Sequence, residues 1–246
     1  EWTEVEVLKE GTLHRIGFER GTVTEPLHKA GERPGSDSGT KISFRPDPDI
    51  FPDTNLRYEI LQHRLRELAY LNGGVKIVFR DDRETAKDAE GNPHEEIYFY
   101  EGGIKEYVAY MNAEKDPLHA DIIYVNSEKE GVQVEAALQW CVDAYSDSIL
   151  GFANNIRTVD GGTHIEGLKT VLTRTLNTFA KKRGKRKEAD GNLAGENIRE
   201  GLTAVLSVKV PDPEFEGQTK TKLGNTEVRG IVDTLVGEAL AEYLEF

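Results

Sequence analysis

Two cationic segments are the strongest candidates for chemistry in this sequence. Residues 181–187 read Lys-Lys-Arg-Gly-Lys-Arg-Lys, six cations in seven positions. Residues 211–213 read Pro-Asp-Pro and lead to Gly-Gln-Thr-Lys at 217–220, so the prolines and the glycine should present Lys220 at a stiff, exposed loop tip. Lysine is a compact positive charge that phosphate sites use routinely. The second segment could therefore hold a phosphate group.

The run at 181–187 has two possible interpretations. A cluster of cations can contact the phosphate backbone of DNA, where each bound Lys or Arg releases a condensed counterion. It can equally be a solvated loop without a partner. If it binds DNA, the residues concerned are Lys181, Lys182, Arg183, Lys185, Arg186 and Lys187.

Other reactive side chains point to structural roles. His164 follows Asp160-Gly161-Gly162, and an Asp–His acid–base pair is one interpretation. Because no Ser or Cys nucleophile follows at a recognisable spacing, we favour a tight turn with His164 in the first turn of a helix. Cys141 has no neighbouring cation to stabilise a thiolate and is interpreted as a structural thiol.

The sequence lacks the common motifs for binding a metal or a nucleotide cofactor. The six histidines are scattered and the single cysteine excludes a multi-cysteine zinc site, so we expect no transition-metal site made by this chain. The sequence contains neither a Walker-type phosphate loop nor Gly-x-Gly-x-x-Gly after a strand.

Composition limits the partners and the compartment. The 246 residues contain 31 Lys and Arg against 44 Asp and Glu, a net charge of −13, so any DNA contact needs a local basic patch. The longest apolar runs are far shorter than the ~20 residues of a membrane helix, and a single cysteine fits a reducing cytoplasm. Because the sequence opens on Glu1 and stops within an apolar-periodic segment, we expect it to be a piece of a longer protein.

Apolar periodicity predicts an α+β fold, because hairpins and helices are mixed without regular βαβ alternation. A capping box of Thr163 and Glu166 should open one of the helices. Strands are expected at 75–80, 97–100, 122–125, 132–140, 149–154 and 202–210, a hairpin at 1–20, a loop at 21–38 and a strand at 40–44. Helices are expected at 58–71, up to 111, from 163 and from 226, with loops at 80–96 and 211–224.

Several longer motifs, in one order along the chain, resemble those of bacterial DNA gyrase B subunits, the ATPase subunits of type IIA topoisomerases. The similarity extends over essentially the whole chain. The motifs are Tyr-Glu-Gly-Gly-Ile-Lys at 100–105, Asn-Asn-Ile at 154–156 with Asp-Gly-Gly-Thr-His at 160–164, Arg-Glu-Gly-Leu at 199–202, Val-Lys-Val-Pro-Asp-Pro at 208–213 and Gln-Thr-Lys at 218–220.

This resemblance implies two domains. Residues 1–99 would be the C-terminal part of a GHKL-type ATPase domain, and residues 100–246 a transducer domain with a ribosomal-protein-like α/β fold. Gln218 and Lys220 would bind the γ-phosphate of ATP, which makes Lys220 the implied catalytic residue. Ser38-Gly39-Thr40 matches the motif whose Thr helps to hold adenine, so Gly39 and Thr40 are also expected at the ATP site.

The resemblance also implies partners and missing parts. ATP-dependent dimerisation with a second B subunit, a gyrase A subunit and double-stranded DNA would accompany strand passage and negative supercoiling. The water-activating Glu, the Asn that holds Mg²⁺ and the Asp that reads adenine would lie outside this sequence, so the chain alone should not hydrolyse ATP. Two alternatives stay open: the decatenating sister topoisomerase, and a non-catalytic nucleic-acid-binding module.

Overall fold

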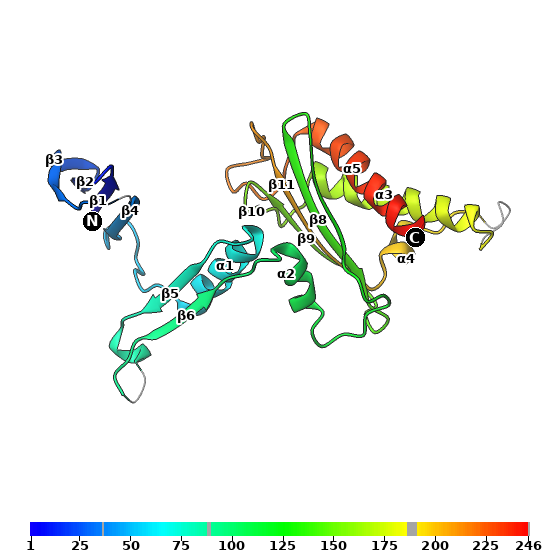
Figure 1. Ribbon diagram of the computed structural model, residues 1–246, viewed down its shortest axis with the longest axis horizontal. Coiled ribbons are helices and arrows are strands. Elements are labelled where there is room, and N and C mark those ends of the chain that lie inside the picture. The colour runs from blue at the N-terminus through cyan, green and yellow to red at the C-terminus, as the bar shows by residue number, and fades with distance from the viewer. Residues whose placement is uncertain (36, 88–89, 186–190, 246) are drawn as a thin grey trace. The chain divides into compact units, whose positions relative to one another are not determined.

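The computed structural model describes residues 1–246 except 36, 88–89, 186–190 and 246 (Figure 1). The chain divides into two compact units, Glu1–Tyr58 and Glu59–Phe246. The division falls earlier than the domain boundary that the sequence places near Phe99, so the helix and hairpin between these points group with the residues that follow. The assignment to an ATPase and a transducer domain stays a prediction.

The first unit is a four-stranded antiparallel sheet in the order β3-β2-β1-β4. Two-residue turns with positive φ join its first three strands, at Glu10-Gly11 and at Arg20-Gly21. Such turns match the twist of paired strands and favour glycine at the second position. The strands are β1 (Trp2–Lys9), β2 (Thr12–Glu19), β3 (Thr22–Glu32) and β4 (Gly39–Arg45).

The strand β3 corrects the prediction of a loop over 21–38. Its side chains are nearly all exposed, and register shifts interrupt its pairing with β2. A strand exposed on both faces has no reason to alternate apolar and polar residues, and Pro26 adds a loop signal. The hydrophobic pattern therefore could not reveal it.

The second unit is built on a five-stranded sheet in the order β10-β9-β11-β8-β7, in which only the β9–β11 pair is parallel. The predicted strands at 132–140, 149–154 and 202–210 are present with shifts of at most one residue, whereas the strand predicted at 122–125 continues to Lys129. The strands are β7 (Ile123–Lys129), β8 (Val132–Trp140), β9 (Ser148–Ala153), β10 (Ile156–Arg157) and β11 (Leu202–Lys209).

Helices cover both faces of this sheet (Figure 1). The long α3 (Thr163–Lys182) and α5 (Thr226–Glu245) pack on one face with the short α4 (Gly195–Arg199), and they bury side chains such as Leu168, Leu206 and Val232. On the other face α1 (Tyr58–Leu71) and α2 (Ile104–Met111) enclose Phe152 and Val205. The strand β11 is buried on both sides as a result.

The remaining elements of the second unit form a hairpin. The strands β5 (Ile77–Asp81) and β6 (His94–Tyr98) pair antiparallel, and the short 3₁₀ helix η1 (Glu84–Ala86) follows β5. This arrangement agrees with the predicted strands around a solvated loop. Mixed helices and antiparallel hairpins make the fold α+β, as the sequence predicts.

The capping box predicted at the start of α3 is wrong. Gly162 occupies the N-cap position, and among the described residues no side chain caps this end; the Thr163 hydroxyl is buried there without a hydrogen-bond partner. The amide of Glu166 instead donates to the carbonyl of Gly162. The chain enters the helix with Gly162 at φ 131°, a conformation that a Thr N-cap would not adopt.

Candidate functional site

The segment Gln218-Thr219-Lys220 lies exposed at the tip of a paired loop. Below the tip, the amide of Glu216 donates to the carbonyl of Lys222 at 2.9 Å, and the amide of Gly224 donates to Glu214 at 2.7 Å. The turn itself uses positive φ angles at Gly217 and Lys220, 78° and 56°. The loop is thus a short ribbon with a defined tip.

Asn225 fastens the two limbs of this ribbon from inside. Its buried side chain accepts the amide of Glu214 at 2.7 Å and donates to the carbonyl of Asp212 at 3.1 Å. A second donor bond reaches the Glu227 carboxylate at the start of α5 at 2.9 Å. A buried side-chain amide with all these partners makes a rigid connection between loop and helix.

Residues 160–163 hold the returning limb from outside. The amide of Asp160 donates to Thr221 at 3.0 Å, the amide of Leu223 to Gly161 at 3.2 Å, and the amide of Thr163 to Leu223 at 3.1 Å. Leu223 is fully buried in the main core. Residues 160–163 of the Asp-Gly-Gly-Thr-His motif therefore pair with the returning limb at the base of the loop.

Gly162 is required for this close approach. A Cβ built on it would lie 2.5 Å from both the amide nitrogen and the carbonyl oxygen of Leu223, at a φ of 131°. Backbone atoms cannot move aside as a flexible side chain can, so any larger residue would push the limb away. The Gly161-Gly162 pair is a sequence signal for a close backbone contact. The sequence does not indicate that Leu223 is the residue that makes it.

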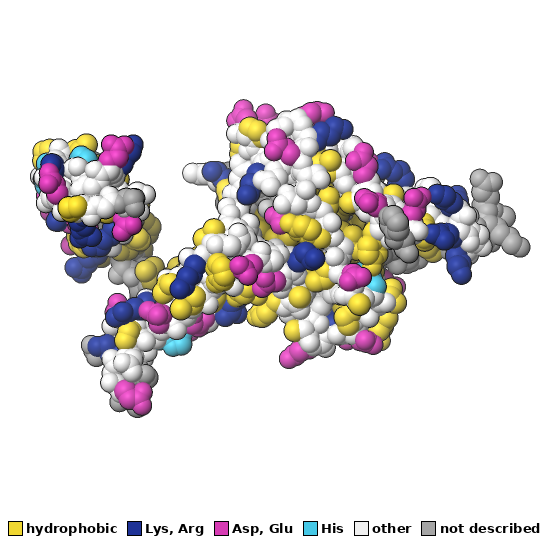
Figure 2. Space-filling model, viewed as in Figure 1, with side chains coloured by type: hydrophobic (Ala, Val, Ile, Leu, Met, Phe, Trp, Pro, Cys, Tyr) yellow, Lys and Arg dark blue, Asp and Glu magenta, His cyan; other side chains and the backbone are white. Residues whose placement is uncertain are grey.

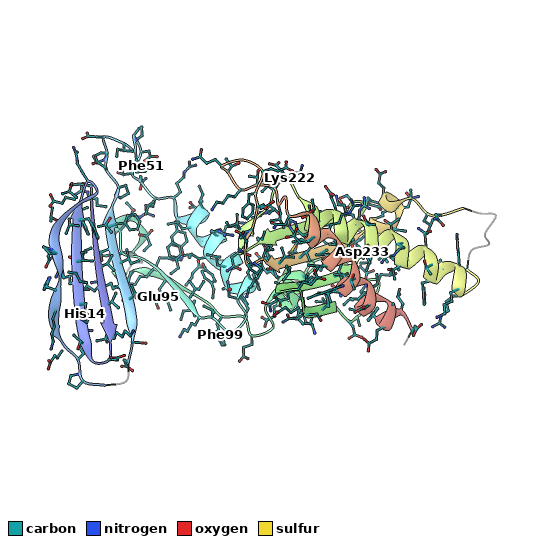
Figure 3. The ribbon with its side chains drawn as sticks, turned by 90° about the horizontal axis from the view of Figure 1, so that it is seen from above. His14, Phe51, Glu95, Phe99, Lys222 and Asp233 are labelled. Atoms are coloured by element: carbon teal, nitrogen blue, oxygen red, sulfur yellow. The ribbon has the colours of Figure 1, made fainter. Side chains whose placement is uncertain are left out.

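The two lysines of the loop differ in their electrostatics. Lys222, labelled in Figure 3, forms an ion pair with Glu216 at 3.0 Å, and this hydrogen bond raises the pKa of the ammonium. Lys220 makes no ion pair among the residues that the structure describes, and its Nζ lies 6.0 Å from the centre of the Phe215 ring. The Lys220 ammonium and the Gln218 amide at the same tip are donors suited to the oxygens of an anion.

His164 lies beneath this base and is fully buried. Its Nε2 lies 2.9 Å from the Thr158 hydroxyl, and burial lowers its pKa to about 4. The segment 158–161 is a turn closed by the amide of Gly161 on Thr158, and His164 follows in the first turn of α3. The structural interpretation of this histidine is confirmed, since a tight turn leads into α3 and the ring is fully buried in its first turn.

Gly39 and Thr40 begin β4 in the first unit. They pair with Leu8 and Val7 of β1, and β4 is an edge strand of its sheet. Together with Ser38 and Lys41 they line a shallow cavity of about 300 Å³. Each pair of ATP-site candidates is thus described within its own unit, Gly39 and Thr40 in the first, Gln218 and Lys220 in the second.

The predicted DNA-contacting run begins at the end of α3, where Figure 2 shows Lys and Arg side chains gathered. Lys182 pairs with Glu245 at 2.9 Å, and Arg183 approaches the carbonyls of Leu244 and Glu245 at 3.5 and 3.4 Å. Two cations of the run are therefore engaged with the end of α5. Lys181 and Lys185 are described without such a contact, and Arg186 and Lys187 lie outside the described residues.

Three further findings concern chemistry elsewhere in the described residues. No three His, Cys, Asp or Glu side chains within this part of the chain gather as a metal site. None of its helices is both long and apolar enough to cross a bilayer. Burial raises the pKa of the Cys141 thiol, which agrees with a structural role.

The fold is similar to that of topoisomerase ATPase regions of known structure. The 43K ATPase domain of Thermus thermophilus gyrase B, solved in complex with an aminocoumarin, superposes with a TM-score of 0.82 at 40% identity and covers 100% of this chain and 64% of that one. A topoisomerase IV ATP-binding domain from Francisella tularensis gives 0.79 at 26% identity, covering 99% of this chain and 64% of that one.

The family model for DNA gyrase B matches residues 103–246, and the chain belongs to this family. It is 63% identical to the DNA gyrase B protein of Synechocystis over 247 residues, and 51% identical to that of Clostridium acetobutylicum over 246. Both matches cover 100% of this chain, which spans 22% and 37% of those relatives. The resemblance predicted from the motifs is confirmed.

Proposed function

We propose that these 246 residues act within a DNA gyrase B protein and couple ATP binding and hydrolysis to DNA strand passage and negative supercoiling. In this proposal Gln218 and Lys220 contact the γ-phosphate of ATP. The nucleotide-binding relatives of known structure support it, because a gyrase B ATPase domain and a topoisomerase IV ATP-binding domain share this fold.

One observation carries the proposal: an ammonium without an ion pair in the described part of the chain, at the tip of a loop whose base is fixed on both sides. Leu223 ties the returning limb to residues 161 and 163, and Asn225 ties the two limbs together. A contact that only ATP offers, and ADP lacks, can bias the position of such a loop. Lys220 would then both stabilise charge on the transferred phosphoryl group and report its presence.

The remaining parts of the site belong to the same proposal. Gly39 and Thr40 would contribute to adenine binding, and Mg²⁺ would be held by residues outside this sequence. The partners would be double-stranded DNA, a gyrase A subunit and a second B subunit, in the cytoplasm. The basic run at the end of α3 would supply a local DNA contact on a chain of net charge −13.

The test is Lys220→Ala in the full-length protein, with Lys222→Ala as the matched control. We expect Lys220→Ala to lower ATP turnover by about a hundredfold, the range for loss of one preorganised charge-stabilising group. Affinity for a non-hydrolysable ATP analogue should fall while affinity for ADP stays nearly constant. Lys222 is already neutralised by Glu216, so its removal should spare this discrimination.

An equal loss of ADP and analogue affinity in Lys220→Ala would contradict the γ-phosphate assignment. Supercoiling of relaxed DNA by the full-length protein with a gyrase A subunit separates the two enzyme alternatives. ATP-dependent negative supercoiling supports gyrase, whereas decatenation without supercoiling would assign the decatenating sister enzyme.

A further inference from the structure

The turn between β9 and β10 consists of two asparagines in the left-handed region. Asn154 has φ 49° and Asn155 has φ 63°. Asparagine tolerates this conformation better than other residues with a side chain, which explains a two-residue turn of this composition. Both residues belong to the Asn-Asn-Ile motif at 154–156, whose role is not explained by the contacts described above.

Asn154 extends the β9–β11 ladder with its side chain. The last backbone pair of that ladder joins Ala153 to Val208, and the amide of Asn154 donates to the carbonyl of Val208 at 2.9 Å. The side-chain Nδ2 then donates to the carbonyl of Val210 at 2.9 Å, and Oδ1 accepts the amide of Val210 at 2.7 Å. One side chain thus satisfies both backbone groups of Val210, as the next residue of a strand would.

Val210 is the root of the loop that carries Gln218 and Lys220. It is buried, and Pro211 follows directly. Pro211 and Pro213 have no amide hydrogen to donate, so backbone pairing cannot easily continue beyond Val210. The two bonds from Asn154 therefore fix the last residue of the outgoing limb before the prolines determine its direction.

Asn155 points to a different partner. Its Nδ2 donates to Oδ1 of Asn72 at 3.3 Å, and its carbonyl accepts Nη2 of Arg64 at 2.5 Å. Both partners belong to α1 or to the residue that follows it. Two adjacent residues of the same type and backbone conformation thus differ in whether the side chain holds the loop.

We propose that Asn154 is a positioning residue for the γ-phosphate loop: it fixes the root of the outgoing limb so that Gln218 and Lys220 meet the nucleotide. This inference rests on the proposed function of those two residues. Asn154 does not touch the nucleotide in this scheme and acts only through Val210. Misplacement of reacting groups by about 1 Å can cost up to a hundredfold in rate, so a loosened root should be measurable.

The experiment compares Asn154→Gly with Asn155→Gly in the full-length protein. Glycine keeps the left-handed backbone at both positions and removes only the side chain. For Asn154→Gly we expect affinity for a non-hydrolysable ATP analogue and kcat each to fall by about tenfold, with ADP affinity nearly unchanged. Asn155→Gly should leave the ratio of analogue to ADP affinity as in the wild type.

Asn154→Asp gives a graded second variant, because its carboxylate can still accept the Val210 amide but cannot donate to the carbonyl. Its affinity for the ATP analogue and its kcat should lie between those of the wild type and Asn154→Gly. If thermal melting shows that Asn154→Gly is not folded, Asn154→Asp provides the test. An unchanged affinity ratio in the folded variants, or an equal loss for both nucleotides, overturns the role of Asn154 when Lys220→Ala shows the selective loss. If Lys220→Ala shows none, the proposed function is wrong as well.

Discussion

The two cationic segments of the second unit differ in the contacts that their described residues make. The loop at 211–225 is paired to residues 160–163 on one side and fastened internally by Asn225, so its tip has a fixed base. The run that begins at Lys181 starts within the last turn of α3, and Lys182 and Arg183 contact the end of α5. One loop has a held backbone and a tip lysine, Lys220, with no ion pair to the described residues. The other has more charge, part of it already engaged.

If Lys220 contacts a phosphate as proposed, charge density alone is a poor guide to a phosphate site. A cation that is exposed or already paired gains little from a single phosphate, because exposed pairs contribute at most about 1 kcal/mol. A cation on a fixed backbone loses less conformational freedom when it binds, so the same contact is worth more. The loop with fewer cations is therefore the better candidate for a switch.

The largest expected effect on ATP turnover comes from testing the 246 residues by themselves. We expect the purified 246-residue chain to show no measurable ATP turnover, because phosphoryl transfer depends on positioning and on metal electrostatics that the loop alone does not supply. Phosphate release at saturating Mg²⁺ and ATP would measure this. Turnover clearly above a blank without protein would show that the loop needs less support than the comparison implies.

A second test breaks the held base directly. Gly162→Ala places a Cβ against the backbone of Leu223, so the returning limb must move. In the full-length protein we expect kcat to fall by about tenfold or more and the protein to lose about 1–3 kcal/mol of stability.

Gly161→Ala is the matched control for that variant. Gly161 has φ 78°, yet a Cβ there meets nothing within 4 Å. Its replacement should cost about 1 kcal/mol of backbone strain and leave ATP turnover close to the wild type. If both variants lower kcat equally, backbone strain rather than the position of the limb is responsible, and the importance of the held base is refuted.

Most of the fold could be predicted from the sequence, because its core elements bury one clear face. The helix at 58–71 and the strand at 132–140 match their predicted bounds, since apolar spacing marks both. The strand β3 could not be found, since it is exposed on both faces and has no alternation. The Thr163–Glu166 spacing predicts a capping box that the start of α3 lacks, because the chain enters the helix at Gly162 in close contact with the backbone of Leu223.

The candidate site was predictable only in part. The prolines and glycine of the 211–224 loop predict a stiff, exposed tip at Lys220, and the structure shows an exposed tip above a hydrogen-bonded base. The partners of that loop are distant in sequence. Asn154, at the end of β9, bonds to Val210, and Gly162, at the start of α3, lies against Leu223. Pairing between segments 56 or more residues apart leaves no local signal, although left-handed Asn-Asn and Gly-Gly turns mark where such contacts occur.

The held base should also respond to acid through His164. Its pKa is about 4 in the folded chain against 6.5 when unfolded, so protonation favours the unfolded state. The stabilising effect of the neutral ring is fully present above pH 6.5 and is lost as the pH falls toward 4. We expect unfolding free energy to drop by about 1 kcal/mol per pH unit across this window, beyond the background of other groups.

Urea unfolding followed by Trp140 fluorescence, in a Trp2→Phe background, measures this in the second unit. His164→Gln can still contact Thr158 but does not titrate, so it should lose the additional slope while keeping the rest of the pH profile. Equal slopes in the two proteins between pH 6.5 and 4 would mean that His164 is protonated without cost, against its complete burial.

The smallest expected effect concerns the basic run, and it tests the other half of the comparison. If the run contacts DNA, replacing Lys181 and Lys185 with Ala in the full-length protein should lower the slope of log affinity against log salt by roughly 0.9 for each lost phosphate contact. Replacing Lys182 and Arg183 should change the slope less, because these two are engaged with the end of α5. Each pair removes the same charge, so a general electrostatic effect would lower both slopes equally. Unchanged slopes in both double variants would show that the run does not contact DNA and is a solvated segment. Of the two cationic segments, only the loop that carries Lys220 would then remain a candidate for phosphate binding.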